Sequence, residues 1–226
     1  GITKAFPGAL ALNDVSFKAG GGQVVALVGE NGAGKSTLLK VLNGDYQPDS
    51  GQYLIDQKEC RFRTPREAIA AGVSVIYQER QIVPYLTVAE NIFMEEIPVG
   101  PARLIDYREL NLRAQEIIDE FKLPFHATDR VKNLSVAYQQ MVEIMKSYRR
   151  DPKVIAFDEP TASLSDAEIE TLFKIIEGLK KKGIIILYVS HRLNEIFQIT
   201  DEVVILKDGA FVGQLATKDT SKSGVI

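Results

Sequence analysis

The sequence predicts an α/β domain with a helical region inserted into it. Near the N-terminus a short apolar run leads through a glycine-rich loop into a helical pattern, and toward the C-terminus apolar strands alternate with an amphipathic helix. This order is typical of a largely parallel sheet covered by helices. We expect a single domain over 1–226, in which residues 88–150 show helical patterns almost throughout. In it, about 1–87 and 151–226 form the α/β core with an antiparallel β subdomain, and about 88–150 form a helical subdomain.

Length, charge and cysteine content narrow the class of protein. The chain has 226 residues, of which 45% are hydrophobic, and a formal net charge of −3. It is long enough to bury a substantial core, and its charge gives no electrostatic reason to expect nucleic acid as a partner. The longest apolar run, Ile184 to Val189, is far shorter than the roughly 20 residues of a membrane span, so any membrane role requires a partner. The single cysteine, Cys60, excludes an internal disulfide and fits a reducing compartment such as the cytoplasm.

The glycine-rich loop matches a phosphate-binding P-loop. Gly29, Gly34, Lys35 and Ser36 satisfy the pattern G-x-x-x-x-G-K-[ST] directly after the apolar run 24–28. Glycines let backbone N–H groups approach phosphate oxygens, and the helix that follows adds its positive end. We expect Lys35 to reach the β- and γ-phosphates and the Ser36 hydroxyl to bind Mg²⁺. The alternative, a plain glycine-rich turn, is disfavoured by the strand before the loop and the helix after it.

Short strands surround this loop in the first third of the chain. Alternating apolar residues predict strands over 2–6, 12–18, 24–28, 52–55 and 73–77, and the early ones look antiparallel. The P-loop helix is expected over 36–43, with Gly44 as its C-cap. A second helix over 65–71 is indicated by the capping box from Thr64 to Glu67, with proline at the first helical position.

Capping signals also indicate where the later helices begin. Thr87 with Glu90 opens a short helix, and Asp106 opens a longer one with an apolar stripe. The remaining elements are helices over 135–149, from Ser165 and over 192–200, and strands over 154–157, 184–189, 203–206 and 210–215. The run 184–189 has the length of a central parallel strand, and Asp208-Gly209 is a good hairpin turn.

Two carboxylates directly follow the apolar strand 154–157. This is the pattern of a Walker B segment, in which Asp158 holds Mg²⁺, usually through water, because a hard cation prefers oxygen ligands. Glu159 is then placed to orient or deprotonate a water molecule. An Asp-Glu pair alone is as often the start of a helix, but together with the P-loop it predicts a nucleotide site.

Five further features, in a fixed order, resemble the ATP-binding cassette (ABC) family, the nucleotide-binding subunits of transporters. They are Phe6 as the aromatic that stacks on adenine, Gln78 as the Q-loop glutamine, Ser135 to Tyr138 after Leu134 as the signature, Ala162 to Ser165 as the D-loop, and His191 as the switch histidine that contacts the γ-phosphate. Alone, Gln78 or His191 would more often be an ordinary polar residue at a strand end and Phe6 a core residue. Their order and spacing carry the resemblance.

The resemblance implies a set of site residues. ATP would be bound by Phe6, Gly29, Asn31, Gly32, Gly34, Lys35, Ser36 and Thr37. Mg²⁺ would be held by Ser36, Gln78 and Asp158, with Glu159, His191 and Gln78 acting in catalysis. The signature Ser135, Val136, Ala137 and Tyr138 would act in trans, on an ATP bound by a second cassette.

Segments 62–68, 84–92 and 139–144 resemble bacterial monosaccharide importers of the ribose and galactose type, in which one polypeptide carries two tandem cassettes. This chain resembles the first cassette, and 217–226 resembles the start of a connector to the second. The resemblance implies ATP hydrolysis that powers import of a small solute, a monosaccharide, through a separate membrane permease, with a solute-binding protein as an indirect partner. The protein would then lie at the cytoplasmic face of the inner membrane, with 79–96 as its docking surface. Nucleosides or signalling molecules are alternative solutes.

The signature departs from the family's Leu-Ser-Gly-Gly-Gln. Ala137 replaces the second glycine and Tyr138 the glutamine. A Cβ where backbone should approach phosphate is expected to interfere, so this half should supply a weakened signature. We therefore expect one competent site on this P-loop and a second that binds ATP but hydrolyses it poorly. Two alternatives are a regulatory cassette that binds ATP with little turnover, and a non-transport ABC ATPase that acts on DNA or ribosomes.

Overall fold

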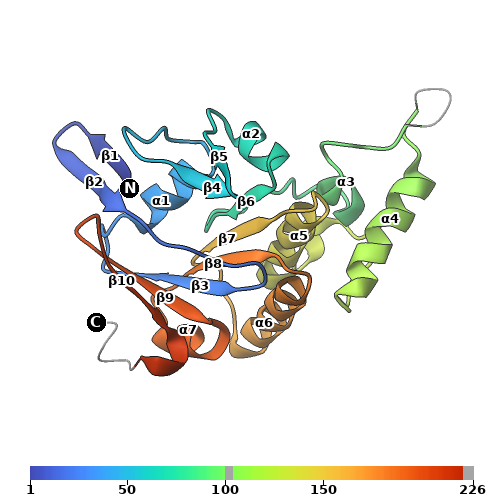
Figure 1. Cartoon of the computed structure of the whole chain (residues 1–226). Coiled ribbons are helices and arrows are strands. Elements are labelled where there is room, and N and C mark those ends of the chain that lie inside the picture. Colours follow the sequence, from blue (N-terminus) through green and yellow to red (C-terminus); the bar gives the residue numbers. More distant parts are fainter. Residues whose placement is uncertain (100–103, 221–226) are drawn as a thin grey trace. The chain divides into compact units, whose positions relative to one another are not determined.

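The computed structural model describes residues 1–99 and 104–220, and the chain divides into two compact units (Figure 1). The first unit comprises Gly1–Val75, Pro152–Pro160 and Leu179–Ile226, and the second comprises Ile76–Asp151 and Thr161–Gly178. The predicted helical subdomain, 88–150, falls within the second unit, which also takes in residues on either side of it. None of the helices in the described ranges combines the length and apolar character that a bilayer span requires.

The first unit is built on a sheet with the strand order β1-β2-β10-β9-β3-β8-β7-β6 within the described residues. These strands are β1 (Ile2–Phe6), β2 (Ala9–Val15), β3 (Val24–Val28), β6 (Val73–Ile76), β7 (Val154–Asp158), β8 (Ile185–Val189), β9 (Glu202–Lys207) and β10 (Ala210–Ala216). In its centre β9, β3, β8 and β7 run parallel to one another. β3 is buried along its whole length and β8 along almost all of it, which confirms the prediction that 184–189 contains a central strand.

The N-terminal strands differ from the prediction at two points. β1 and β2 are antiparallel, as expected, but a parallel bridge from Asn13 to Ala210 joins β2 to the large sheet. β2 ends at Val15 rather than at Lys18, and Phe17 packs against the core from the loop that follows the strand. The apolar alternation through Phe17 therefore continued past the end of the strand.

A separate two-stranded sheet contains a strand that the sequence did not reveal. β4 (Tyr53–Ile55) pairs antiparallel with β5 (Lys58–Cys60). The turn between them places Asp56 and Gln57 at φ of 51° and 62°. β5 has no apolar alternation, and its place in the sheet follows from this turn.

The helices of the first unit cover the sheet that holds the P-loop. They are α1 (Lys35–Leu42), α2 (Pro65–Ala70), α7 (Leu193–Ile199) and the short 3₁₀ helix η2 (Thr217–Asp219). α1 packs Leu38 and Leu39 into the same core as Val25 and Leu27 of β3. The hairpin of β9 and β10 is antiparallel, as predicted from its turn. Residues 221–226 of the predicted connector lie outside the described residues.

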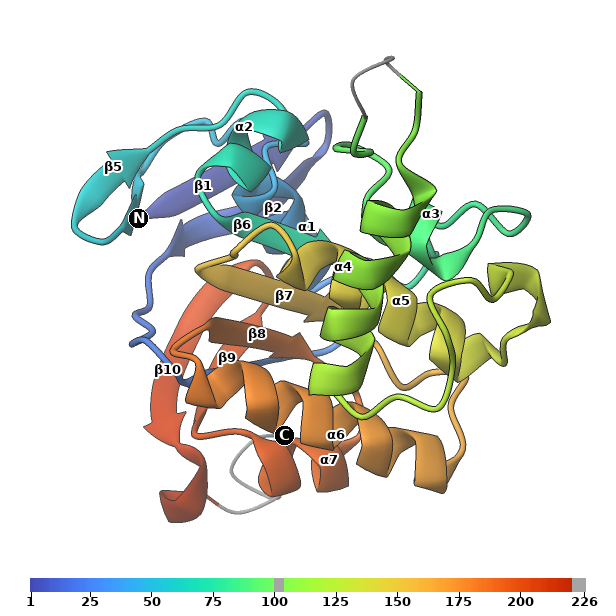
Figure 2. The same ribbon diagram turned by 90° about the vertical axis from the view of Figure 1, so that its right-hand side faces the viewer.

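The described part of the second unit is helical (Figure 2). Its elements are α3 (Val88–Ile92), α4 (Tyr107–Glu120), the 3₁₀ helix η1 (Val131–Asn133), α5 (Val136–Tyr148) and α6 (Asp166–Lys181), which belongs to this unit up to Gly178. α3 packs against α4 and α5. The predicted capping box at its start is complete: the Thr87 hydroxyl accepts from Glu90 N–H at 3.2 Å, and the Glu90 carboxylate accepts from Thr87 N–H at 2.7 Å.

Candidate nucleotide-binding site

The P-loop joins β3 to α1 and wraps around a buried lysine. The Lys35 ammonium donates to the carbonyl oxygens of Gly29, at 2.7 Å, and Glu30, at 2.9 Å. Gly34 has a φ of 98°, and a Cβ there would lie 2.6 Å from the carbonyl oxygen of Ala11. A side chain is therefore excluded at Gly34 by both backbone conformation and space.

The other predicted ATP-binding residues of the loop lie at its surface. Asn31, Gly32 and Ser36 are exposed, and Thr37 is half-buried in the first turn of α1. Gly32 has a φ of 85°, and a Cβ there would have no heavy atom within 4 Å. The loop thus presents its tip to solvent while it holds Lys35 inside.

Two carboxylates lie at the end of β7, where the parallel strands β3, β8 and β7 finish at one edge of the sheet. Asp158 accepts a hydrogen bond from the Ser36 side chain. Glu159 has a φ of 52°, uncommon for a residue with a side chain, and its N–H donates to the carbonyl oxygen of Val189 at 3.0 Å. The strained backbone holds Glu159 in a turn against the end of β8.

Burial disfavours both charges beside the loop. It lowers the pKa of Lys35, and the neighbouring Glu159 and Asp158 oppose that shift. It also raises the pKa of Asp158, and the hydrogen bond from Ser36 opposes that shift. The cation and the carboxylates therefore stabilise one another in a poorly solvated environment, where interactions with a charged ligand are strong.

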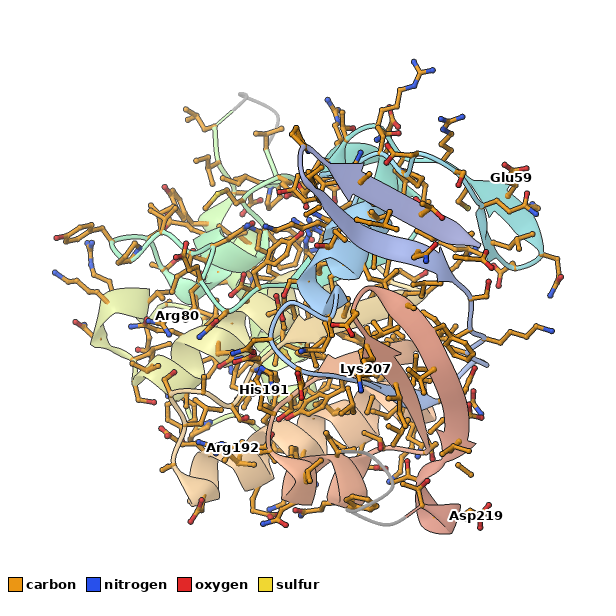
Figure 3. All side chains as sticks on the ribbon, turned by 90° about the vertical axis from the view of Figure 1, so that its left-hand side faces the viewer. Glu59, Arg80, His191, Arg192, Lys207 and Asp219 are labelled. Atoms are coloured by element: carbon orange, nitrogen blue, oxygen red, sulfur yellow. The ribbon has the colours of Figure 1, made fainter. Side chains whose placement is uncertain are left out.

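His191 binds Glu159 directly. Its Nε2 lies 2.7 Å from Glu159 Oε1, and the two side chains are 43% and 31% exposed. His191 stands on the loop that follows β8, next to Arg192 (Figure 3). The two predicted catalytic side chains of the first unit thus form one pair that a reactant can reach.

Phe6, at the end of β1, is half-buried rather than a core residue. Its ring packs edge to face against Tyr46, with 5.1 Å between ring centroids, and the Lys4 ammonium lies 5.5 Å from the Phe6 centroid. Its remaining exposed surface leaves room for the predicted stacking on adenine.

Gln78 and the signature residues belong to the second unit. Gln78 is exposed and comes soon after the end of β6. Ser135 is the N-cap of α5, where its hydroxyl accepts from Tyr138 N–H at 3.3 Å, and it donates to the Glu168 carboxylate at 3.3 Å. The Tyr138 ring is half-buried and packs against Phe125.

The burial of Ala137 contradicts the expectation that its Cβ stands where a phosphate would approach. Ala137 is only 1% exposed, so its methyl group faces the interior of the second unit. Val136, which replaces the first signature glycine, is 39% exposed at the first position of α5. The side chain added at the surface of the signature is therefore that of Val136.

The chain matches a known protein family over most of its length. The profile of the family described as "ABC transporter" matches residues 12–162. The chain belongs to the ABC transporter family. It is 50% identical over 93% of its length to the arabinose import ATP-binding protein AraG of Mannheimia succiniciproducens, and 42% identical over 94% to a putative ribose/galactose/methyl galactoside import ATP-binding protein of Pseudomonas savastanoi pv. phaseolicola. It spans 42% and 40% of those two proteins.

Solved ABC cassettes share the fold. A nucleotide-free ATP-binding cassette from an ABC transporter superposes with a TM-score of 0.86 at 27% identity, covering 99% of this chain and 94% of that one. A cassette in its ADP conformation gives a TM-score of 0.84 at 26% identity, covering 99% and 90%. The predicted fold class, an ABC-type α/β core with an antiparallel β subdomain and a helical subdomain, is confirmed.

One residue at the candidate site of this ABC cassette was not predicted from the sequence. Tyr46, the ring partner of Phe6, lies in a loop after Gly44, where no pattern distinguishes it. Val136 was predicted as part of the signature, but the sequence did not indicate that it, rather than Ala137, carries the exposed side chain. Which signature position faces solvent depends on how α5 is rotated against its neighbours, and a motif does not record that.

Proposed function

We propose that this chain is the ATP-binding and ATP-hydrolysing part of an importer for a small solute, a monosaccharide. One observation carries the proposal: Lys35, the Ser36–Asp158 pair and the Glu159–His191 pair meet at one edge of the parallel sheet. The relatives are named as import proteins for arabinose and, putatively, for ribose, galactose and methyl galactoside, which supports the solute class. A transport assay with arabinose, ribose and galactose would show which of these sugars is imported.

Binding of ATP would use the loop and the start of α1. The N–H groups of the loop and the helix N-terminus favour the phosphates, and Lys35 can exchange its contacts with Gly29 O and Glu30 O for phosphate oxygens. Phe6 would stack on the adenine ring. With ATP bound in this way, the γ-phosphate would lie next to the carboxylates at the end of β7.

The donor set beside the loop fits Mg²⁺. The Ser36 hydroxyl and the Asp158 carboxylate are hydrogen-bonded neighbours, and a hard cation prefers such oxygen ligands together with waters and phosphate oxygens. Gln78 would supply a further oxygen. Bound Mg²⁺ would neutralise negative charge on the phosphates.

Glu159 and His191 would carry the chemical step. Glu159 would orient and deprotonate the attacking water, while His191, held 2.7 Å from it, would contact the γ-phosphate. The turn that fixes Glu159 against Val189 keeps its carboxylate at the edge of the sheet. Lys35 would stabilise the charge that develops on the transferred phosphoryl group.

The proposed partners are a second cassette, a membrane permease and, indirectly, a solute-binding protein. Coverage of about two-fifths of each relative supports a tandem arrangement in one polypeptide. The signature at Ser135 to Tyr138 would complete the second cassette's ATP site, with Val136 rather than Ala137 weakening it. The protein would thus work at the cytoplasmic face of the membrane.

The permease would dock on residues 79–96 and the surface beside them. A hollow of about 450 Å³ in the second unit is lined by Phe93, Arg113, Tyr148 and Arg149, among others. The guanidinium groups of Arg113 and Arg149 stack on Phe93, with distances of 5.0 and 5.2 Å from the guanidinium carbons to the ring centroid. Phe93 itself is only 2% exposed and Arg149 is paired with Glu95 and Glu96, so these two residues shape the surface from within.

Replacement of Glu159 tests the proposal. In the full-length protein, Glu159→Gln should lower phosphate release about 100-fold or more while ATP binding persists, because only the proton acceptor is lost. Glu59→Gln, on the exposed β5, is the matched control and should keep turnover. Undiminished hydrolysis by Glu159→Gln would contradict the assignment of the competent site.

The second candidate function is a regulatory cassette that binds ATP with little turnover. The exposed Val136 in the signature favours it, and the intact Glu159–His191 pair argues against it. The two are separated by the Mg-ATP turnover of the full-length protein. Binding without release of phosphate would support the regulatory function.

A further inference from the structure

Glu195 is a buried carboxylate that the proposed chemistry does not use. It lies in the first turn of α7, and its side chain is only 7% exposed. Burying a carboxylate is costly unless hydrogen bonds compensate for the lost water. Its partners therefore indicate what the residue is for.

Three side chains bind this carboxylate. Oε2 accepts from the Tyr188 hydroxyl at 2.9 Å and from the Ser190 hydroxyl at 2.9 Å, and the Arg192 guanidinium lies 3.3 Å from Oε1. Tyr188 is fully buried on β8 and Ser190 is 4% exposed. Glu195 thus ties the end of β8 to the start of α7.

These contacts involve the residues directly before and after His191 in the sequence. Ser190 precedes the histidine and Arg192 follows it, and the Arg192 N–H donates to the Ser190 hydroxyl oxygen at 3.0 Å. His191 itself projects from this closed turn and remains partly exposed, and Figure 3 labels it beside Arg192. The backbone of the histidine is therefore held through its two neighbours, while its side chain contacts Glu159.

We propose that Glu195 is a positioning residue that holds the loop 190–192 so that His191 faces Glu159 and the γ-phosphate. This inference rests on the proposed function, in which His191 contacts the γ-phosphate. A catalytic group must be held within a fraction of an ångström of its productive position, and hydrogen bonds from outside the reacting atoms provide this. Loss of the Glu195 contacts leaves the loop free to move His191 away.

A double-mutant cycle in the full-length protein, assembled with its permease, tests the inference. Glu195→Ala removes all three contacts, with Tyr188, Ser190 and Arg192, and it should lower kcat on the order of tenfold with KM for ATP nearly unchanged. In the His191→Ala background the same change should have no further effect on kcat, because its effect passes through the histidine. Ser190→Ala, which removes one of the three links, is the second variant and should lower kcat less, with the same lack of additivity.

Asp201→Asn is the matched control. The Asp201 carboxylate accepts from Lys180 at 2.7 Å and from Val24 N–H at 2.8 Å, at the end of β3 opposite the P-loop. This variant should lower the unfolding temperature of the protein without changing kcat. Comparison with this variant separates the effect of lower stability on kcat from the effect of a displaced His191.

The outcomes distinguish the two proposals. Equal effects of Glu195→Ala on kcat with and without His191, or an equal drop in kcat for Asp201→Asn, would overturn the positioning role alone. Full activity of His191→Ala would overturn both that role and the proposed contact of His191 with the γ-phosphate. A kcat loss that appears only when His191 is present would support the inference.

Discussion

Gly34 offers a quantitative test of the P-loop conformation, through the substitution Gly34→Ala. Alanine at a φ of 98° pays a conformational cost of about 1–2 kcal/mol. The new Cβ would also lie 2.6 Å from the Ala11 carbonyl oxygen and 2.8 Å from Leu12 Cδ2. Such overpacking adds about 1–3 kcal/mol, so the free energy of unfolding should fall by about 2–5 kcal/mol.

Two other glycines separate these contributions. Gly32 and Gly183 have φ of 85° and 84°, and a Cβ at either would have no heavy atom within 4 Å. Gly32→Ala and Gly183→Ala should therefore cost only the conformational part, about 1–2 kcal/mol. Urea unfolding of the three variants measures the difference. If Gly34→Ala destabilised the protein no more than Gly32→Ala, the close approach of Ala11 to the loop would be refuted.

Two further predictions concern other parts of the chain. Burial raises the pKa of Tyr53 from 10.0 to about 12, so the stability it contributes is complete below pH 10 and is lost as the pH rises toward 12. The free energy of unfolding should fall by at most about 2.7 kcal/mol, and by less because solvent screens the half-buried ring. Urea unfolding at about pH 8 and pH 11 measures this fall, which should be absent in Tyr53→Phe. Val136→Gly should raise ATP turnover of the full-length protein, whereas Ala137→Gly should only destabilise α5 by about 1 kcal/mol. Higher turnover from Ala137→Gly than from Val136→Gly would contradict the orientation of the signature.

Locally encoded features were predictable from the sequence. The capping box of Thr87 and Glu90 forms both of its hydrogen bonds, and the Asp208-Gly209 turn has the two positive φ angles, 49° and 78°, that a tight hairpin needs. In each case the residues that form the feature are only a few positions apart in the sequence. Their geometry follows from residues that are close in sequence.

Features that depend on which distant residues meet were not predictable in the same way. β5 is polar and becomes a strand through its pairing with β4. Ala137 and Val136 are neighbours in the motif, yet α5 buries one and exposes the other. Both outcomes follow from packing between elements rather than from residue type.

The family, the fold class and the residue types of the nucleotide site can be recognised from the amino-acid order alone, because a P-loop needs glycines, a lysine and a hydroxyl at fixed spacing. How those residues are held follows from the packing of distant segments. Parallel strands bring their ends to one edge of the sheet, so Glu159 after β7 meets His191 after β8. The burial of Glu195 beneath the loop 190–192 depends on how α7 packs, and no local pattern records it.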